Sequence, residues 1–197
     1  MKKFETLELD LNSLKTGDLI CMRYELSPSA LLIRWATNLR KPKHLRSPYN
    51  HIAMVVMIQG KPFIAEALSS GFGRLTSAKA RLKGKKIAIR RTTFSISKQL
   101  FNKHVIDFAY AALKYDFKGT FLEQAIFQLT GYKKNKSEKE GDEKLYCSEA
   151  YARMINKQIS DMYNGEDGEI PYYMVDPQDL YVDERYKTIY EGKVKIN

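Results

Sequence analysis

The stretch NHIAMVVMIQGKPFIAEAL, residues 50–68, contains two apolar segments joined by a short polar turn. Residues 50–58 and 62–68 are rich in β-branched and long apolar side chains, and Gln59-Gly60-Lys61 lies between them. Apolar runs of this length on either side of a glycine-containing turn predict a β-hairpin. Both faces of each strand are largely apolar, so we expect the hairpin inside a sheet and not at its edge.

Two polar residues, His51 and Glu66, interrupt these apolar strands, one on each. An even-numbered loop, for example one that pairs Ile58 with Lys61, places both on one face, diagonally across the strand pair. An odd-numbered loop places them on opposite faces. A carboxylate beside an imidazole fixes the ring tautomer and stabilises its charged form, as the base of a cysteine enzyme requires. A core histidine and an acid at the sheet end are the alternatives.

The rest of the chain supplies further strands and helices around this hairpin. Apolar runs predict strands at residues 19–24 and 86–92. Helical spacing of apolar residues predicts helices at residues 29–39, 97–114, 121–129 and 147–158. Residues 69–84, which contain Gly71 and Gly73, predict a long connection. We therefore expect an α+β fold in which residues 1–197 form a single domain.

Residues 133–144, KKNKSEKEGDEK, form a wholly polar insertion. Without apolar side chains, this segment can bury almost nothing that would offset the entropy lost on ordering. The insertion ends just before Cys147, so we expect a mobile flap that proteases cut in the free protein and that a bound substrate analogue protects. A plain surface loop is the alternative.

Composition narrows the class of partner. With 33 Lys and Arg against 23 Asp and Glu, the chain of 197 residues has a formal charge of +10, which favours anionic partners. The cations are scattered and no nucleic-acid-binding signature accompanies them, so we expect no nucleic acid partner. No apolar run approaches the roughly 20 residues of a membrane span, and residues 1–11 hold no apolar signal-peptide core. We expect no membrane span and a cytoplasmic location.

The two cysteines, Cys21 and Cys147, differ in their surroundings. Two cysteines are too few for a disulfide framework or a structural zinc site, and we expect neither a metal nor a cofactor. Cys21 follows apolar residues in a predicted strand and is interpreted as a core residue. Cys147 begins a helical sequence, where backbone N–H groups favour a thiolate nucleophile, and an ordinary buried cysteine is the alternative. We interpret His44 as a solvated loop residue and His104 as a helix residue with no acid beside it.

Several motifs, taken in order, resemble the circularly permuted papain-like amidases. These are relatives of the NlpC-type cell-wall peptidases and include the YiiX/YaeF-like group. The resemblance spans residues 17–181, and the ordered set is more specific than any one motif. In papain the cysteine helix precedes the histidine strand, whereas here it follows, as in the permuted group. The motifs are Gly17-Asp18-Leu19-Ile20, Ile33-Arg34-Trp35, Asn50-His51-Ile52-Ala53-Met54-Val55-Val56, Glu66-Ala67, Tyr146-Cys147-Ser148-Glu149 and Val175-Asp176-Pro177-Gln178-Asp179-Leu180-Tyr181.

The resemblance implies a fold, a set of site residues and an activity. The implied fold is a small antiparallel sheet or half-barrel packed against helices. The implied catalytic residues are Cys147 as nucleophile, His51 as general base and Glu66 as the third polar residue. Many NlpC-type relatives have a second histidine where this chain has Glu66. The implied activity is that of a cysteine amidase or peptidase, which hydrolyses an amide bond through a thioacyl-enzyme.

The expected substrate is a small peptide or amide related to cell-wall peptides, and carboxylate-rich fragments would suit the positive charge. Related permuted folds transfer or remove acyl chains, so a lipid acyltransferase or thioesterase with the same Cys–His pair is the first alternative. In that case Tyr172, Tyr173 and Tyr181 would line an acyl pocket. A non-catalytic binding module is the second alternative.

Overall fold

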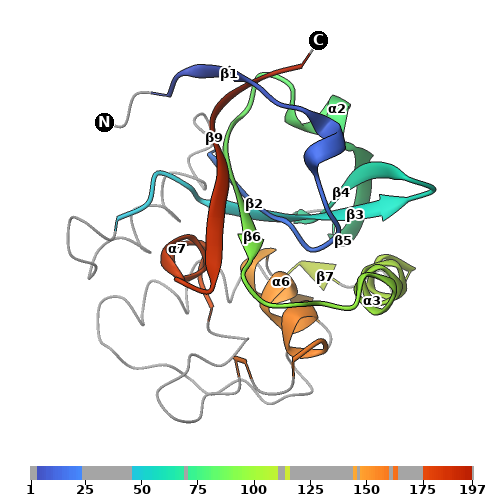
Figure 1. Cartoon of the computed structure of the whole chain (residues 1–197). Coiled ribbons are helices and arrows are strands. Elements are labelled where there is room, and N and C mark those ends of the chain that lie inside the picture. Colours follow the sequence, from blue (N-terminus) through green and yellow to red (C-terminus); the bar gives the residue numbers. More distant parts are fainter. Residues whose placement is uncertain are drawn as a thin grey trace.

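The computed structural model describes residues 4–23, 46–68, 71–110, 114–115, 144–145, 147–159, 162–163 and 175–196. In these ranges the chain has a mixed α+β fold built on a curled seven-stranded sheet, a half-barrel (Figure 1). The strand order is β1-β9-β6-β2-β3-β4-β5, and every neighbouring pair is antiparallel except β1 and β9. The strands are β1 (Thr6–Glu8), β2 (Leu19–Arg23), β3 (His51–Ile58), β4 (Lys61–Leu68), β5 (Gly71–Ser77), β6 (Lys86–Thr92) and β9 (Tyr186–Lys195).

The hairpin predicted from residues 50–68 is present as β3 and β4. Ile58 pairs with Lys61, and the two residues between them, Gln59 and Gly60, have φ values of 50° and 74°. A two-residue turn with positive φ at both positions has the twist that joins two antiparallel strands directly. The loop is therefore even-numbered. The expected interior position is also confirmed, because β2 flanks β3 and β5 flanks β4.

Apolar side chains form a separate buried cluster on each face of the sheet. Neighbouring residues of β2 fall into different clusters, Cys21 into one and Ile20 into the other, as the period of two along a strand requires. The first cluster lies against the helices α3, α6 and α7 (Figure 1). The second includes Ala78 and Leu82 of α2. The helices are η1 (Leu11–Ser13), α2 (Ala78–Leu82), α3 (Lys98–Tyr110), α6 (Cys147–Asn156) and α7 (Pro177–Val182).

Three parts of the fold differ from the sequence prediction. Residues 69–84, predicted as a connection, contain β5 and α2. Ser77 caps α2, because its hydroxyl accepts a hydrogen bond from the N–H of Ala80 at 3.4 Å. Strands β1 and β9 were not predicted, because polar and charged residues interrupt the apolar residues in both of them. A short parallel pair, β7 (Lys114–Tyr115) with β8 (Lys144–Leu145), was also not predicted.

Some predicted elements lie outside the described residues. These are the helices at residues 29–39 and 121–129, and residues 133–143 of the polar insertion. The predictions of strands at 19–24 and 86–92 are confirmed by β2 and β6, and the prediction of a helix at 147–158 by α6. The helix predicted at 97–114 is confirmed by α3 over residues 98–110, whereas Lys114 lies in β7.

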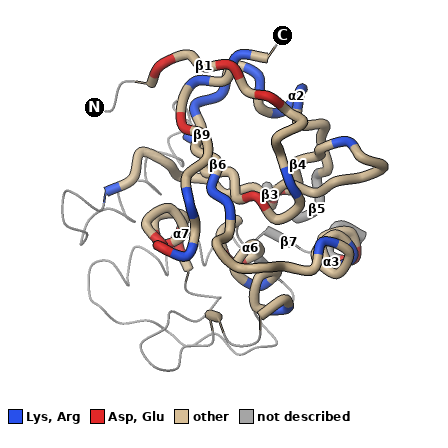
Figure 2. The backbone as a smooth tube through the Cα atoms, in the orientation of Figure 1, with Lys and Arg blue, Asp and Glu red and all other residues tan. Residues whose placement is uncertain are grey.

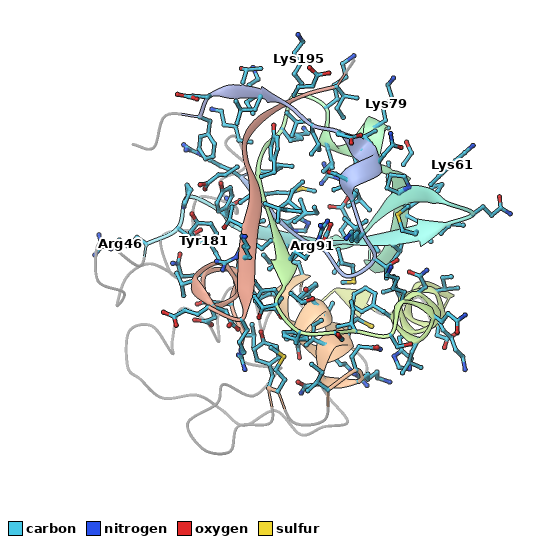
Figure 3. The ribbon with its side chains drawn as sticks, viewed as in Figure 1. Arg46, Lys61, Lys79, Arg91, Tyr181 and Lys195 are labelled. Carbon is cyan, nitrogen blue, oxygen red and sulfur yellow. The ribbon has the colours of Figure 1, made fainter. Side chains whose placement is uncertain are left out.

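Cationic side chains are spread over the described surface. Lys and Arg positions occur on α2, α3, β6 and β9 (Figure 2). Lys61, Lys79 and Lys195 point away from the body of the fold (Figure 3). This distribution agrees with the scattered charge expected from the sequence. Among the described residues, no helix is long and apolar enough to cross a membrane.

The turn before β2 depends on Gly17. Its φ is +87°, its N–H donates to the Val55 carbonyl at 2.9 Å, and its carbonyl accepts from the Tyr151 hydroxyl at 2.9 Å. A Cβ at this position would lie 2.0 Å from Cδ1 of Ile96. Gly17→Ala should therefore lower the free energy of unfolding by about 2–3 kcal/mol, from backbone strain and displacement of Ile96. Guanidinium unfolding followed by circular dichroism measures this loss.

Gly60→Ala is the matched control for that change. Gly60 also has a positive φ, +74°, but a Cβ there would have no atom within 4 Å. Only the backbone strain remains, so the expected loss is about 1 kcal/mol. Equal losses in the two variants would contradict the contribution assigned to Ile96.

Candidate active site

Cys147 is the first residue of α6, and several contacts hold this helix start in place. The Ser148 hydroxyl donates to the Val175 carbonyl at 2.7 Å, which joins the first turn of α6 to the segment before α7. One turn later, Tyr151 donates to Gly17 at 2.9 Å. Cys147 itself is 5% exposed. A cysteine at the first turn of a ten-residue helix lies at the positive end of the helix dipole, where a thiolate is favoured.

His51 and Glu66 meet on one face of the hairpin. Glu66 lies directly opposite Ala53 in the register, so His51, two residues earlier on β3, is its diagonal neighbour. The His51 Nε2 and Glu66 Oε2 atoms are 2.9 Å apart. Both side chains are buried, and Glu66 has no exposed surface. The predicted pairing of these two residues is therefore confirmed, and it follows from the two-residue turn.

His51 also faces Cys147. Burial acts to lower the pKa of His51, but the charge of Cys147, its hydrogen bond with the ring, and the contact with Glu66 together raise that pKa from 6.5 to about 10. A hydrogen bond and an opposite charge both favour the protonated ring. The structure thus brings together, in one chain of contacts, the three residues selected from the sequence: Cys147, His51 and Glu66.

A fourth residue, Arg81 of α2, joins this chain of contacts and was not predicted. Its Nη2 donates to Glu66 Oε2 at 2.7 Å, and its Nε donates to Oε1. The Arg81 side chain is 14% exposed. No pattern in the sequence links Arg81 to Glu66, because the contact forms only when β5 and α2 return along β4. The capping residue Ser77 was the available signal for the helix itself.

The other cysteine and the other histidines do not share this environment. Cys21 is fully buried on β2, as predicted, and burial raises the pKa of its thiol far above the usual range. His104 lies on α3, where burial lowers its pKa. His44 lies outside the described residues.

The segment before and within α7 contacts both the start of α6 and the chain that enters β3. Asp176 caps α7 by accepting hydrogen bonds from the N–H groups of Gln178 and Asp179 at 2.7 and 2.8 Å. Gln178 has no exposed surface, and its side-chain oxygen accepts from the N–H of Ser47, just before β3. The motif at residues 175–181 therefore holds the start of α6 and the chain entering β3 in one place.

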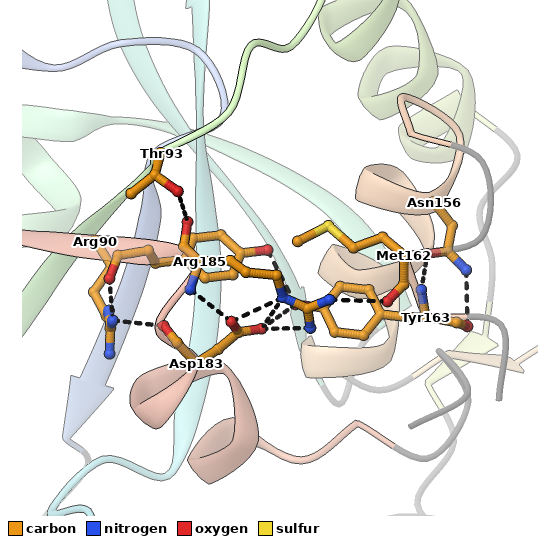
Figure 4. A network of polar contacts seen from close by, with 8 residues as sticks. Arg90, Thr93, Asn156, Met162, Tyr163, Asp183 and Arg185 are labelled. Atoms are coloured by element: carbon orange, nitrogen blue, oxygen red, sulfur yellow. Dashed lines mark hydrogen bonds and ion pairs between the residues drawn. The ribbon is translucent and has the colours of Figure 1, made fainter. Parts of the chain in front are cut away.

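A polar network fixes the far end of α7 (Figure 4). Asp183 forms an ion pair with Arg185 at 2.8 Å and accepts a hydrogen bond from the Tyr163 hydroxyl at 2.9 Å. Arg90 of β6 donates to the carbonyl of Asp183 at 2.8 Å and to that of Tyr186. These contacts tie the end of α7 to β6, β9 and the turn after α6.

The pKa of His51 gives an expected pH dependence. The folded-state pKa, about 10, lies above the ordinary value of 6.5. Protonated His51, which faces Cys147 of α6 and Glu66 of β4, therefore contributes stability that is fully present below about pH 6.5 and is lost as the pH rises through about 10. The difference in unfolding free energy between the wild type and His51→Gln should shrink over this range in guanidinium titrations. A difference that grows with pH would contradict the assignment.

The described residues around His51 do not form a set of metal ligands. Among the described residues, no group of three or more His, Cys, Asp and Glu side chains is arranged to hold a metal. Glu66, which contacts His51, has both oxygens engaged by Arg81. Structural metal sites in proteins use about four ligands, and catalytic zinc sites use three protein ligands.

Comparison with known proteins gives a fold and no more. No protein-family model matches the chain, and no curated protein matches it. Among solved structures, the chain is similar to a crystal structure described as metalloprotein YiiX from Escherichia coli O157:H7, with a TM-score of 0.61 and 21% sequence identity. The match covers 91% of this chain and 98% of that one. The chain thus has a YiiX-like mixed α+β fold, in agreement with the YiiX-like resemblance and the half-barrel expected from the sequence.

Proposed function

We propose that this protein is a cysteine hydrolase of the circularly permuted papain-like type, acting as an amidase or peptidase. The observation that carries the proposal is the contact chain Cys147–His51–Glu66. A thiol at a helix start faces an imidazole that also contacts a buried carboxylate. A nucleophile, a base and an orienting group in this order form the general arrangement for covalent acyl transfer.

The raised pKa of His51 indicates where the proton rests before reaction. At neutral pH the ring holds a proton where it faces Cys147. In the proposed mechanism Cys147 reacts as the thiolate. The thiolate attacks the carbonyl carbon of the substrate and forms a C–S bond, giving a tetrahedral oxyanion. His51 then gives its proton to the leaving amine as the C–N bond breaks. A water molecule, which loses a proton to His51, attacks the thioacyl-enzyme, and the acid leaves with Cys147 restored.

The start of α6 also supplies a donor for the oxyanion. The backbone N–H of Cys147 belongs to the first turn of the helix, where N–H groups have no partner within the helix. A backbone donor held beside the nucleophile stabilises charge that develops only in the transition state. The Ser148 hydroxyl, in the same turn, holds the helix start against the Val175 carbonyl.

The proposed substrate is a small peptide or amide related to cell-wall peptides. A formal charge of +10 favours carboxylate-rich fragments. The alternative of a lipid acyl substrate relied on Tyr172, Tyr173 and Tyr181. The first two lie outside the described residues, and Tyr181 donates to Glu191 at 3.0 Å and packs on Tyr49. Peptide amides therefore come first in a substrate screen, with acyl esters as the comparison.

Thiol labelling tests the proposal without a known substrate. Iodoacetamide at about pH 7, followed by peptide mass spectrometry, should label Cys147 at least about a hundredfold faster than Cys21. The reason is that Cys147 has a protonated imidazole beside it, whereas burial raises the pKa of the Cys21 thiol. Equal rates, or faster labelling of Cys21, would remove Cys147 as the nucleophile.

A further inference from the structure

The environment of Glu66 requires a second cation besides His51. The side chain has no exposed surface, and a buried carboxylate is costly unless it is paired and hydrogen-bonded. Arg81 approaches it with two nitrogens, Nη2 at 2.7 Å from Oε2 and Nε on Oε1. A two-point contact of this kind fixes the plane of the carboxylate as well as its distance, because a guanidinium is planar.

One carboxylate oxygen serves both cations. Glu66 Oε2 accepts from Arg81 Nη2 at 2.7 Å and lies 2.9 Å from His51 Nε2. Arg81 thus sets the direction in which this oxygen points toward His51. Of the elements packed on Glu66, β3 contributes His51 and α2 contributes Arg81, while β5 places Arg74 opposite Glu66 in the strand register.

The sequence explains why α2 presents Arg81 to β4. Ser77 caps the helix, and Ala78 and Leu82, one turn apart, are its buried residues. Positions three and four apart lie on one side of a helix, so Arg81, three residues after Ala78, lies next to this buried stripe. The helix contacts β4 and β5, which brings the guanidinium to Glu66.

We propose that Arg81 is a positioning residue of the candidate active site, which holds the Glu66 carboxylate in place and aims its Oε2 at His51. Through Glu66, Arg81 fixes the ring orientation of His51 beside Cys147 and limits how strongly the carboxylate attracts the ring proton. The catalytic meaning of this role rests on the proposed hydrolase function. The electrostatic coupling between Arg81 and His51 does not, and it can be measured on its own.

The chain offers a matched control pair, Arg91 and Asp18. Arg91 Nε donates to Asp18 Oδ1 and Nη2 donates to Oδ2, both at 2.7 Å, and Asp18 is 1% exposed. This is the same two-point contact with a buried carboxylate. The backbone carbonyl of Asp18 accepts a hydrogen bond from the N–H of Val55, four residues along β3 from His51. Arg91 lies on β6 (Figure 3). Changes at Arg91 therefore report the structural cost of losing such a contact away from the site.

The experiment compares Arg81→Met and Arg81→Lys with Arg91→Met and Arg91→Lys. The titration of the His51 ring is followed by NMR, and the rate of Cys147 alkylation by iodoacetamide is followed across pH. In Arg81→Met no guanidinium offsets the charge of Glu66, so this charge acts on His51 alone. The titration midpoint of the His51 ring should therefore rise by about one pH unit. Alkylation should slow about tenfold as the ring loses its fixed orientation. Arg81→Lys keeps the charge, so its midpoint should stay within about 0.3 units of the wild type while alkylation slows severalfold.

The Arg91 variants should change thermal stability but neither of these two readouts. If the Arg81 variants do the same, losing only stability, the proposal is overturned. If Arg81→Met does not fold, the alkylation rate of Arg81→Lys decides the matter, because a purely structural role predicts the wild-type rate. Slow labelling of Cys147 in the wild type itself would reject the hydrolase function, whereas a shifted His51 midpoint in Arg81→Met would still support the coupling.

Discussion

His51→Gln should reduce amide hydrolysis about a thousandfold or more and should slow iodoacetamide labelling of Cys147 about a hundredfold. The ring is the group that holds the proton beside the thiolate and later gives it to the leaving amine. Glutamine is similar in size and keeps a hydrogen-bonding end, but it cannot carry the proton. Labelling is measured by peptide mass spectrometry, and hydrolysis is measured on the peptide amide that a substrate screen selects.

His104→Gln is the control for this change. His104 lies on α3, and among the described residues its charged neighbours are Lys103, Asp107 and Lys157. Both rates should stay within about twofold of the wild type. Unchanged labelling of Cys147 in His51→Gln would show that His51 does not activate the thiol, and the amidase proposal would then lose its base. Hydrolysis of acyl esters but not of peptide amides by the wild type would direct the assignment to the lipid acyl alternative.

The centre of the fold and of the candidate site could be predicted because both depend on local sequence. The glycine-containing turn predicted the hairpin, but the sequence left open whether its loop is even- or odd-numbered. The structure decides this with a two-residue turn at Gln59 and Gly60, and that turn determines the register of β3 and β4. Once the register is known, His51 and Glu66 must share a face. The place of Cys147 at a helix start likewise follows from the residues after it.

The parts that could not be predicted depend on contacts between distant segments. Strand β9 has buried side chains at only a few of its positions, so its apolar pattern is too sparse to identify it. It forms because β6 pairs with it over residues 86–92. The contact of Arg81 with Glu66 could not be predicted for the same reason, since it forms only when α2 packs on β4. Sequence patterns predict single elements and adjacent pairs, and tertiary contacts complete the site.

Glu66→Ala should lower the free energy of unfolding by about 3–5 kcal/mol, the usual cost of removing one partner from a buried ion pair. The loss arises because Arg81 and His51 would remain buried without the carboxylate that both contact. The pKa of His51 should also fall, since the hydrogen bond and charge of Glu66 contribute to raising it. Guanidinium unfolding and NMR titration of the ring measure the two effects.

Asp18→Ala is the control that separates the effect of losing a buried ion pair from the effect of losing the contact with His51. Asp18 is as deeply buried as Glu66 and is held by Arg91 through the same two-point contact. Its removal should cost a similar amount of stability, because it also leaves a guanidinium without its carboxylate. Only Glu66→Ala should lower the pKa of His51 and slow the labelling of Cys147, because Glu66 contacts the ring and Asp18 does not. If both variants slow the labelling equally, the effect comes from general loosening of the fold, and the role of Glu66 as the orienting carboxylate is rejected.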